Sequence, residues 1–163
     1  MFGLFKTYDV HMCSEVKGVL TLDGSPLGGI VVNRYLKFAY KLEKEDQTIT
    51  NQDGSFYLPE VKIQSKIPGD MFSQESTFQL ITVNYSDKSY ELWRSKFPGL
   101  VELSEYKKKL SCLNGDLSSE KVNFAFQNDT DENLEFSASS ICRWENDFEV
   151  YQINDDTDYF KDL

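Results

Sequence analysis

Two stretches decide the fold: residues 18–32, GVLTLDGSPLGGIVV, and residues 48–59, TITNQDGSFYLP. Each carries β-branched, aliphatic or aromatic residues on both sides of an Asp-Gly pair. Asp-Gly supplies the left-handed backbone of a tight turn, and the flanking runs are typical of short strands. In the first stretch, Gly28 and Gly29 permit a bulge or a close backbone approach at the start of the second strand. Both stretches therefore predict antiparallel strand pairs.

Further segments extend this pattern along the chain. Residues 78–85 alternate with both faces fairly apolar, which predicts a central strand, and a turn leads into a partner strand at 89–94. Residues 122–127 and 148–153 are two more strand candidates. Residues 100–110 fit either a short helix or a strand. We expect a mainly all-β fold, with a short helix near 100–110 as one alternative.

Several segments carry no strand pattern. Residues 41–46 form a charged stretch between strands, and residues 60–77 have no clean period and contain Pro68-Gly69, which indicates a long excursion. Residues 107–109 are three lysines, which we expect as an exposed cationic patch. His11 precedes the first predicted strand, and we expect it at the surface or as a capping residue.

The two stretches quoted above resemble the carboxypeptidase-regulatory-like, or prealbumin-like (transthyretin-like), β-sandwich family. In that family the pattern G-x-V…D-G-x-P-L-x-G-V-x-V opens the sandwich, and T-x-x-D-G-x-F-x-L/F closes its third and fourth strands. The resemblance implies an antiparallel β-sandwich and a non-catalytic accessory or binding module, with no catalytic residues to carry over. The chain as a whole also resembles short bacterial proteins built on this domain.

The resemblance sets the expected domain organisation. We expect an N-terminal arm at 1–15 and a single β-sandwich domain at 16–153, followed by an acidic tail at 154–163. Within the domain, the prealbumin-like match covers 16–95 and a C-terminal extension covers 96–153. Whether the extension adds strands to the sandwich or forms a subdomain stays open.

Length and charge exclude several classes of protein. With 163 residues, 40% hydrophobic and 27% charged, the chain reads as one globular domain. No run approaches the roughly 18–20 apolar residues of a membrane-spanning helix. A net charge of −10 disfavours nucleic acid as a partner. The first residues show no signal-peptide pattern, so we expect a cytoplasmic protein, or a periplasmic one if a leader is missing.

The sequence offers no recognisable catalytic set. His11 is the only histidine, which leaves no Ser/His/Asp or Cys/His arrangement easy to assemble. Three cysteines, Cys13, Cys112 and Cys142, are free thiols in one interpretation; in the other, Cys112 and Cys142 form a disulfide. No stretch completes a calcium loop or a phosphate-binding loop. We therefore expect no enzyme activity, no metal and no cofactor.

Acidity is concentrated at the C-terminal end, where residues 122–163 hold 2 basic and 11 acidic side chains. Aromatic residues are interleaved with these acids, a composition found at interface centres within a charged surround. A solvated tail and ordinary core packing are the alternatives. The candidate partner-binding residues are Trp144, Glu145, Asp147, Glu149, Tyr151, Asp155, Asp156 and Asp158.

Two functional hypotheses follow. The first is a bacterial immunity-type inhibitor that binds and neutralises a cationic toxin or secreted effector, for example one delivered by type VI secretion, because an acidic surface speeds the capture of a basic enzyme. The second is an accessory peptide- or protein-binding module of an envelope or secretion system, since edge strands can accept a peptide strand. Both make the partner a protein, and neither fixes the oligomeric state.

Overall fold

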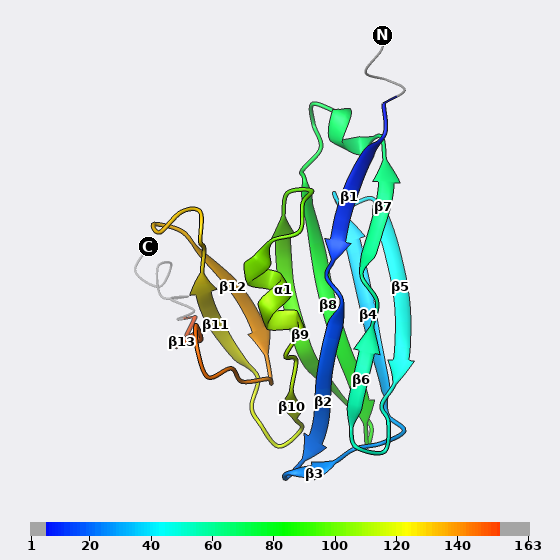
Figure 1. Cartoon of the computed structure of the whole chain (residues 1–163), viewed down its shortest axis with the longest axis vertical. Coiled ribbons are helices and arrows are strands. Elements are labelled where there is room, and N and C mark those ends of the chain that lie inside the picture. The colour runs from blue at the N-terminus through cyan, green and yellow to red at the C-terminus, as the bar shows by residue number, and fades with distance from the viewer. Residues whose placement is uncertain (1–5, 154–163) are drawn as a thin grey trace, which may run out of the picture.

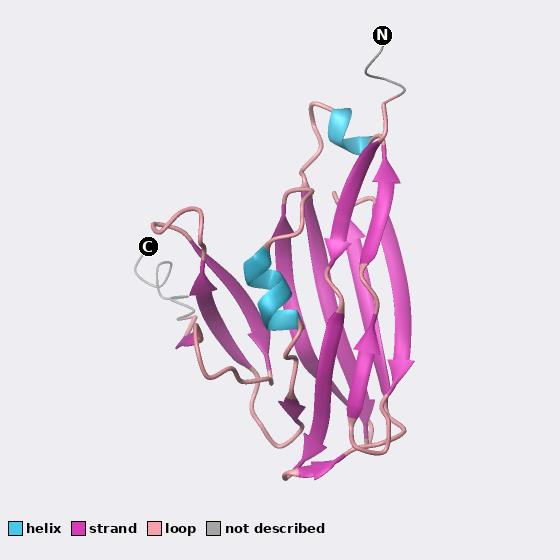
Figure 2. Ribbon diagram, in the orientation of Figure 1, coloured by secondary structure: helices cyan, strands magenta, loops and turns pink. Residues whose placement is uncertain are grey.

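The fold is a β-sandwich with one short α-helix at its side (Figures 1 and 2). The structure is a computed structural model that describes residues 6–153. The expected mainly all-β fold is confirmed, and the helix alternative for residues 100–110 is correct. The elements are β1 (Tyr8–Cys13), β2 (Val16–Leu22), β3 (Ser25–Pro26), β4 (Val31–Phe38), β5 (Leu42–Ile49), β6 (Ser55–Leu58), β7 (Val61–Ser65), the 3₁₀ turn η2 (Ile67–Gly69), β8 (Ser76–Tyr85), β9 (Lys88–Pro98), α1 (Ser104–Leu110), β10 (Gly115–Asp116), β11 (Val122–Gln127), β12 (Glu135–Ser140) and β13 (Glu149–Tyr151).

One layer is a seven-stranded sheet in the order β13-β11-β12-β9-β8-β4-β5. Strand β8 lies inside this sheet, with β4 and β9 antiparallel on its two sides. Its alternate residues Gln79, Ile81 and Val83 are buried. The Gln79 amide donates a hydrogen bond to the carbonyl of Met12 in β1, at 2.8 Å. The prediction of a central strand at 78–85 is therefore confirmed.

The second layer is a long ribbon in which β1 leads into β2 and β6 leads into β7 (Figure 1). β1 pairs with β7, and β2 pairs with β6, both antiparallel. The first Asp-Gly turn forms as predicted, with φ of 50° at Asp23 and 83° at Gly24. The predicted strand pairs are wrong, because β2 pairs with β3 and β6, whereas β4 and β5 belong to the seven-stranded sheet. Each Asp-Gly stretch therefore leads from one layer of the sandwich to the other. A Cβ added at Gly28 would lie 2.9 Å from the Asn51 carbonyl oxygen, so the close backbone approach is the alternative realised there.

Asp116 fixes the turn that follows β2. Its carboxylate accepts hydrogen bonds from the backbone N–H groups of Asp23 and Gly24 at 3.1 and 2.9 Å, and from the Thr21 hydroxyl at 2.8 Å. The Ser118 hydroxyl and backbone N–H donate to the same carboxylate. These bonds, the Ser118 hydroxyl foremost, hold the pKa of Asp116 far below its usual range.

The N-terminal arm expected at 1–15 is corrected for its described part. Tyr8–Cys13 form strand β1, and Val10 and Met12 are fully buried in the core. The sequence pattern did not predict this strand, because no Asp-Gly pair or other turn signal stands next to it. The domain therefore begins earlier than residue 16.

Two segments expected to lack strands also form them. Residues 42–46 of the charged stretch 41–46 lie within β5, whose eight residues all pair with β4 along one edge of the sheet. Charged residues are common on edge strands because they prevent further pairing, so composition alone misreads such a strand as a linker. Within the excursion expected at 60–77, Val61–Ser65 form β7, which pairs with β1.

The C-terminal extension adds strands to the sandwich. β11 pairs with β12 and with β13, and β12 joins β9 through the pair Ser139 and Arg94. The hairpin of β11 and β12 continues the seven-stranded sheet on the side of α1 (Figure 1). This answers the question that the sequence left open for the described part of residues 96–163.

All three cysteines are free, so the disulfide alternative is not realised. Cys13 and Cys142 are buried, and Cys112 is exposed. Burial raises the pKa of Cys13 to about 11 and that of Cys142 to about 12. Among the described residues, no helix is long and apolar enough to cross a membrane.

Candidate functional site

Three of the expected partner-binding residues line one groove. Trp144, Glu145 and Asp147 belong to the loop between β12 and β13, which lies opposite α1. The groove between this loop and α1, called the α1 groove below, has a volume of about 610 Å³. Its lining residues come from the helix, the loop and the neighbouring connections: Glu105, Lys108, Lys109, Cys112, Asn114, Gln127, Asp129, Arg143, Trp144, Glu145, Asn146 and Asp147.

The other expected residues lie outside this groove. Glu149 and Tyr151 stand on β13, where both are exposed. Asp155, Asp156 and Asp158 lie outside the described residues. The structure thus brings three of the eight candidates into one cavity and places two on the strand beside it.

Trp144 is held by aromatic packing. Its ring lies 4.9 Å from Phe124, 5.7 Å from Phe148 and 6.1 Å from Trp93, measured between ring centroids. Its indole Nε1 donates a hydrogen bond to the backbone carbonyl of Lys109 at 3.2 Å. The side chain is half-buried, so Trp144 belongs to the edge of the core and also presents surface to the groove.

Lys107 and Lys108 are exposed, as expected for the cationic patch at 107–109, but Lys109 is buried, which corrects the expectation for that residue. Its ammonium donates a hydrogen bond to the Asn146 carbonyl at 3.0 Å and lies 3.8 Å from the Asp147 carboxylate. Burial lowers the pKa of Lys109, and the charge of Asp147 opposes that change. Asp147 also accepts a hydrogen bond from the Gln127 backbone at 2.6 Å. Asp147 is therefore a structural partner of the helix rather than a free acid.

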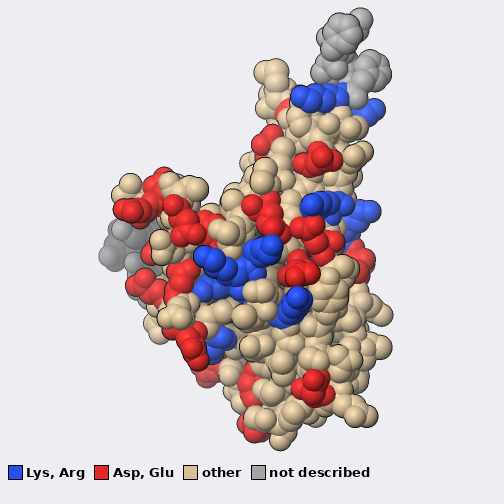
Figure 3. Space-filling view, in the orientation of Figure 1, with Lys and Arg blue, Asp and Glu red and all other residues tan. Residues whose placement is uncertain are grey.

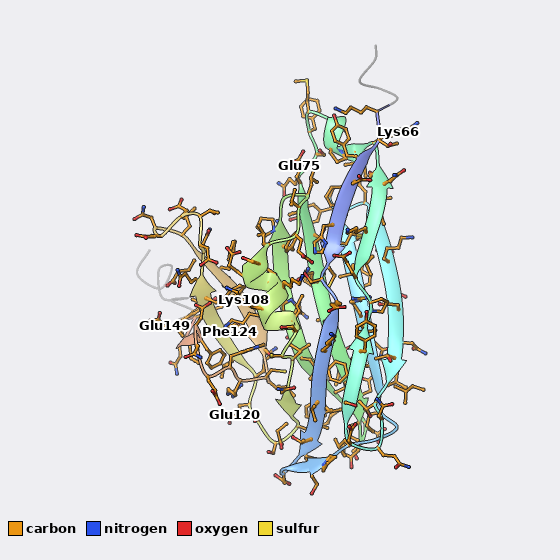
Figure 4. The ribbon with its side chains drawn as sticks, viewed as in Figure 1. Lys66, Glu75, Lys108, Glu120, Phe124 and Glu149 are labelled. Carbon is orange, nitrogen blue, oxygen red and sulfur yellow. The ribbon has the colours of Figure 1, made fainter. Side chains whose placement is uncertain are left out.

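Charges of both signs surround the groove. Figure 3 shows Lys and Arg side chains gathered over the helix, with Asp and Glu on both sides. The acidic rim consists of two exposed acids, Asp129 in the connection from β11 to β12 and Glu145 in the loop after β12, and the exposed Arg143 of that loop also lines the groove. The basic strip consists of the exposed Lys107 and Lys108 on α1. Figure 4 shows Phe124 of β11 between Lys108 on α1 and Glu149 on β13. The surface thus carries charges of both signs, rather than being uniformly acidic.

A second cluster surrounds His11, where sequence analysis expected no site. One ring nitrogen of His11 and one carboxylate oxygen each of Glu60 and Glu102 lie within 4.8 Å of one another. These residues come from β1, from the link between β6 and β7, and from the link between β9 and α1. The Ser14 hydroxyl donates a hydrogen bond to Glu102 at 3.0 Å and lies 3.4 Å from His11 Nε2.

Burial and nearby charges shift the pKa values of this cluster in opposite directions. Burial lowers the pKa of His11, and the charges of Glu102 and Glu60 partly offset this effect. Burial by itself would raise the pKa of Glu102, but the Ser14 hydrogen bond and the charges of Lys107 and His11 bring it below its usual value. The structure therefore favours the neutral form of the His11 imidazole and the ionised form of the Glu102 carboxylate.

The expectation that His11 lies at the surface or caps an element was wrong, because its side chain is only 4% exposed. The signal that could have located it is the run of buried residues around it, Val10, Met12 and Cys13. The two glutamates could not have been found from the sequence. They lie 49 and 91 positions from His11, and only the pairing of β1 with β7 and the course of the chain before α1 bring them near.

Comparison with known proteins places the chain in one family. No curated protein and no solved structure matches it. A family model described as a domain of unknown function, DUF6795, matches residues 16–120. This range includes both stretches that decide the fold, together with α1, and it ends before β11. Because the match covers well over half of the 163 residues, the chain belongs to the DUF6795 family.

Proposed function

We propose that this chain is a non-catalytic protein-binding domain of the immunity type, which captures a basic toxin or secreted effector at the α1 groove. The observation that supports the proposal is the acidic rim of that groove, where Glu145 and Asp129 are exposed beside the half-buried ring of Trp144. An aromatic residue within a charged rim is the usual composition of a protein interface. In this proposal, residues 16–95 are a prealbumin-like scaffold.

The charge of the chain supports a basic partner. The net charge is −10, and residues 121–153 hold seven acidic and two basic side chains. Opposite charges attract over about 10 Å at moderate salt, which raises the rate at which a basic protein finds this face. The basic strip on α1 then restricts the orientation in which a basic partner can dock, because it repels like charge.

The groove suits binding better than catalysis, because its polar groups are engaged with one another. Lys109 pairs with Asp147, and Glu105 accepts a hydrogen bond from the backbone of Asp129 at 3.1 Å. These contacts fix the walls of the groove. His11, the single histidine of the chain, does not line it.

The accessory-module hypothesis has weaker support. It requires an edge strand that accepts a peptide strand. At the edge formed by β5, four consecutive residues, 43–46, are charged, which is typical of edges that resist pairing.

The test is capture of the partner followed by a functional assay. The full chain is used as bait in an extract of its native cell, and bound proteins are identified by mass spectrometry. The partner is then expressed alone and together with the chain. We expect a basic protein whose expression inhibits growth, and growth restored by co-expression. A captured protein whose toxicity or activity the chain leaves unchanged would refute the inhibitor proposal.

A matched pair of variants locates the surface. Glu145→Gln removes a charge at the groove, and Glu75→Gln removes the same charge far from it, as Figure 4 shows for Glu75. We expect only the first to weaken inhibition. Cell fractionation tests the proposed cytoplasmic location against a periplasmic one.

A further inference from the structure

We propose that His11, Glu60 and Glu102 form a binding site for a divalent transition-metal ion, with Zn²⁺ as its best match. The three side chains present one nitrogen and two oxygen ligand atoms within 4.8 Å of one another. One imidazole and two carboxylates are ligands that zinc takes in proteins, and three protein ligands leave a fourth position for water.

The buried imidazole is the observation that points to a ligand. His11 is 4% exposed, and its Nδ1 atom is buried without a hydrogen-bond partner. A buried polar atom left without a partner costs roughly 1–3 kcal/mol, so it calls for an explanation. The nearest carboxylate oxygen, Glu60 Oε2, lies 3.5 Å away. This separation is long for a hydrogen bond but close to the roughly 3.4 Å between two ligands of one tetrahedral zinc ion with bonds of about 2.0–2.1 Å.

The carboxylates are oriented for this role. Glu60 directs Oε1 to Lys62 at 3.2 Å, and Glu102 directs Oε1 to Lys107 at 3.5 Å. The second oxygen of each carboxylate, Oε2, lies near the ring of His11, at 3.5 Å from Nδ1 for Glu60 and at 4.0 Å from Nε2 for Glu102. The two oxygens approach different nitrogens of the ring. An ion bound at one of these nitrogens takes both oxygens from within 4.8 Å of it. Outer partners of this kind fix the direction of metal ligands. Lys62 and Lys107 also reduce the net negative charge around the cluster, which limits its affinity for a cation.

The site is open to ions from solution. Glu60 and Glu102 are 37% and 31% exposed, whereas the imidazole lies beneath them. Two carboxylate side chains and one imidazole give the cluster an acidic character that suits a cation, although Lys62 and Lys107 offset part of the negative charge. An imidazole favours zinc, copper, nickel or cobalt over magnesium and calcium, which prefer oxygen ligands alone.

A bound ion would connect three segments that are distant in the sequence. The β1–β7 register shifts between His11 and Cys13, and the His11 backbone N–H donates to the Leu100 carbonyl at 2.8 Å. Irregularities of this kind often lie beside functional sites. The ion would therefore join β1 to the chain before α1 and stabilise the folded state according to its concentration.

The experiment measures zinc binding to the full chain, purified without a histidine tag and stripped with a chelator. Cys112→Ser serves as the background, because the exposed Cys112 thiol could bind zinc by itself. Titration calorimetry with zinc chloride should show one ion per chain, and the melting temperature should rise with zinc. Cobalt should give the visible absorption of a four-coordinate nitrogen and oxygen site.

Two variants and one control make the test specific. Glu60→Gln and Glu102→Gln change partly exposed side chains, and each should weaken zinc binding at least tenfold while the fold is retained. Glu15→Gln, which removes a carboxylate of similar exposure from the same ribbon, should leave binding unchanged. Absence of saturable binding at one ion per chain, or equal affinity in the Glu60 and Glu102 variants and the parent, would overturn the proposal. In that case His11, Ser14 and the two glutamates form a polar cluster that binds no ion.

Discussion

Lys109 and Trp144 hold each other in place through two different contacts. The Trp144 indole donates a hydrogen bond to the Lys109 carbonyl at 3.2 Å, and the Lys109 ammonium lies 5.5 Å from the centre of the Trp144 ring. A cation over an aromatic face is attracted by the ring quadrupole, more strongly where water is excluded. The helix and the loop after β12 are therefore fastened together at the floor of the α1 groove.

This relationship gives the first prediction. Trp144→Ala should lower the free energy of unfolding by about 2–3 kcal/mol, because the ring packs against Phe124 and Phe148 and leaves a cavity when removed. Urea unfolding followed by circular dichroism measures this change. Tyr151→Ala, at a side chain that is 39% exposed, should change stability by less than about 1 kcal/mol. Equal stability of the two variants would mean that Trp144 is free for a partner.

The second prediction concerns the rate of association with the proposed partner. Glu145→Gln together with Glu149→Gln should slow association about two- to fivefold at low salt, with little change in dissociation, because exposed charges mainly steer encounter. Surface plasmon resonance over a range of salt concentrations measures both rates. The same direction is expected for neutralisation of three acids outside the described residues: Asp155, Asp156 and Asp158.

The control for charge steering is a double variant away from the groove. Glu75→Gln together with Asp87→Asn removes the same total charge, and both residues are exposed. This pair should slow association less than the variants at the groove. If both pairs have the same effect, only the net charge matters and the acidic rim carries no special role.

The third prediction concerns Asp116 and pH. Its pKa is lowered in the folded state by hydrogen bonds from Ser118, Gly24 and Thr21, so the folded state favours the ionised form. The stabilisation is fully present above the unfolded value of about 3.9 and is lost progressively as pH falls from there toward the lowered pKa of the folded state. Asp116→Asn should cost roughly 1–2 kcal/mol at neutral pH and less near pH 3. Urea unfolding at both pH values tests this, and equal costs would contradict it.

The fourth prediction concerns thiol reactivity. Cys112 is exposed, whereas burial raises the pKa of Cys13 to about 11 and that of Cys142 to about 12. Because the thiolate is the reactive form, a maleimide should label Cys112 in the folded chain and leave the two buried thiols unmodified until urea is added. Mass spectrometry of the labelled peptides reports the result. Labelling of Cys13 in the folded state would show that β1 opens.

The sequence was most informative where a turn has a chemical requirement. The Asp-Gly turns and the alternation of residues 78–85 predicted the strands β2, β6 and β8, because left-handed backbone and a two-sided core leave local traces. Strand β5 left no such trace. The turn before β5 has left-handed backbone at Ala39 and Tyr40, and neither residue type is typical of such a turn. The charged residues of β5 are typical of a strand at the edge of a sheet.

The two candidate sites also differ in how far local sequence patterns could predict them. Trp144, Glu145 and Asp147 are near neighbours in the sequence, so a local pattern of composition could group them, whereas the groove they line was not predicted. The pairing of Lys109 with that loop was not predictable, because it depends on where α1 packs. The cluster at His11 depends on strand pairing between distant segments, and no local pattern encodes that.

The junction between β12 and β9 is built largely from side-chain contacts. Only one residue pair, Ser139 and Arg94, forms the ladder there, and serine side chains supply further hydrogen bonds: Ser95 to the Ser137 carbonyl at 2.8 Å and Ser140 to the Leu92 carbonyl. The backbone N–H of Ile141 adds one more hydrogen bond, to the Glu91 carbonyl at 3.0 Å. At this junction, serine hydroxyls therefore stand in for most of a regular strand ladder, and the attachment of the β11–β12 hairpin depends on side chains that a change of sequence can remove.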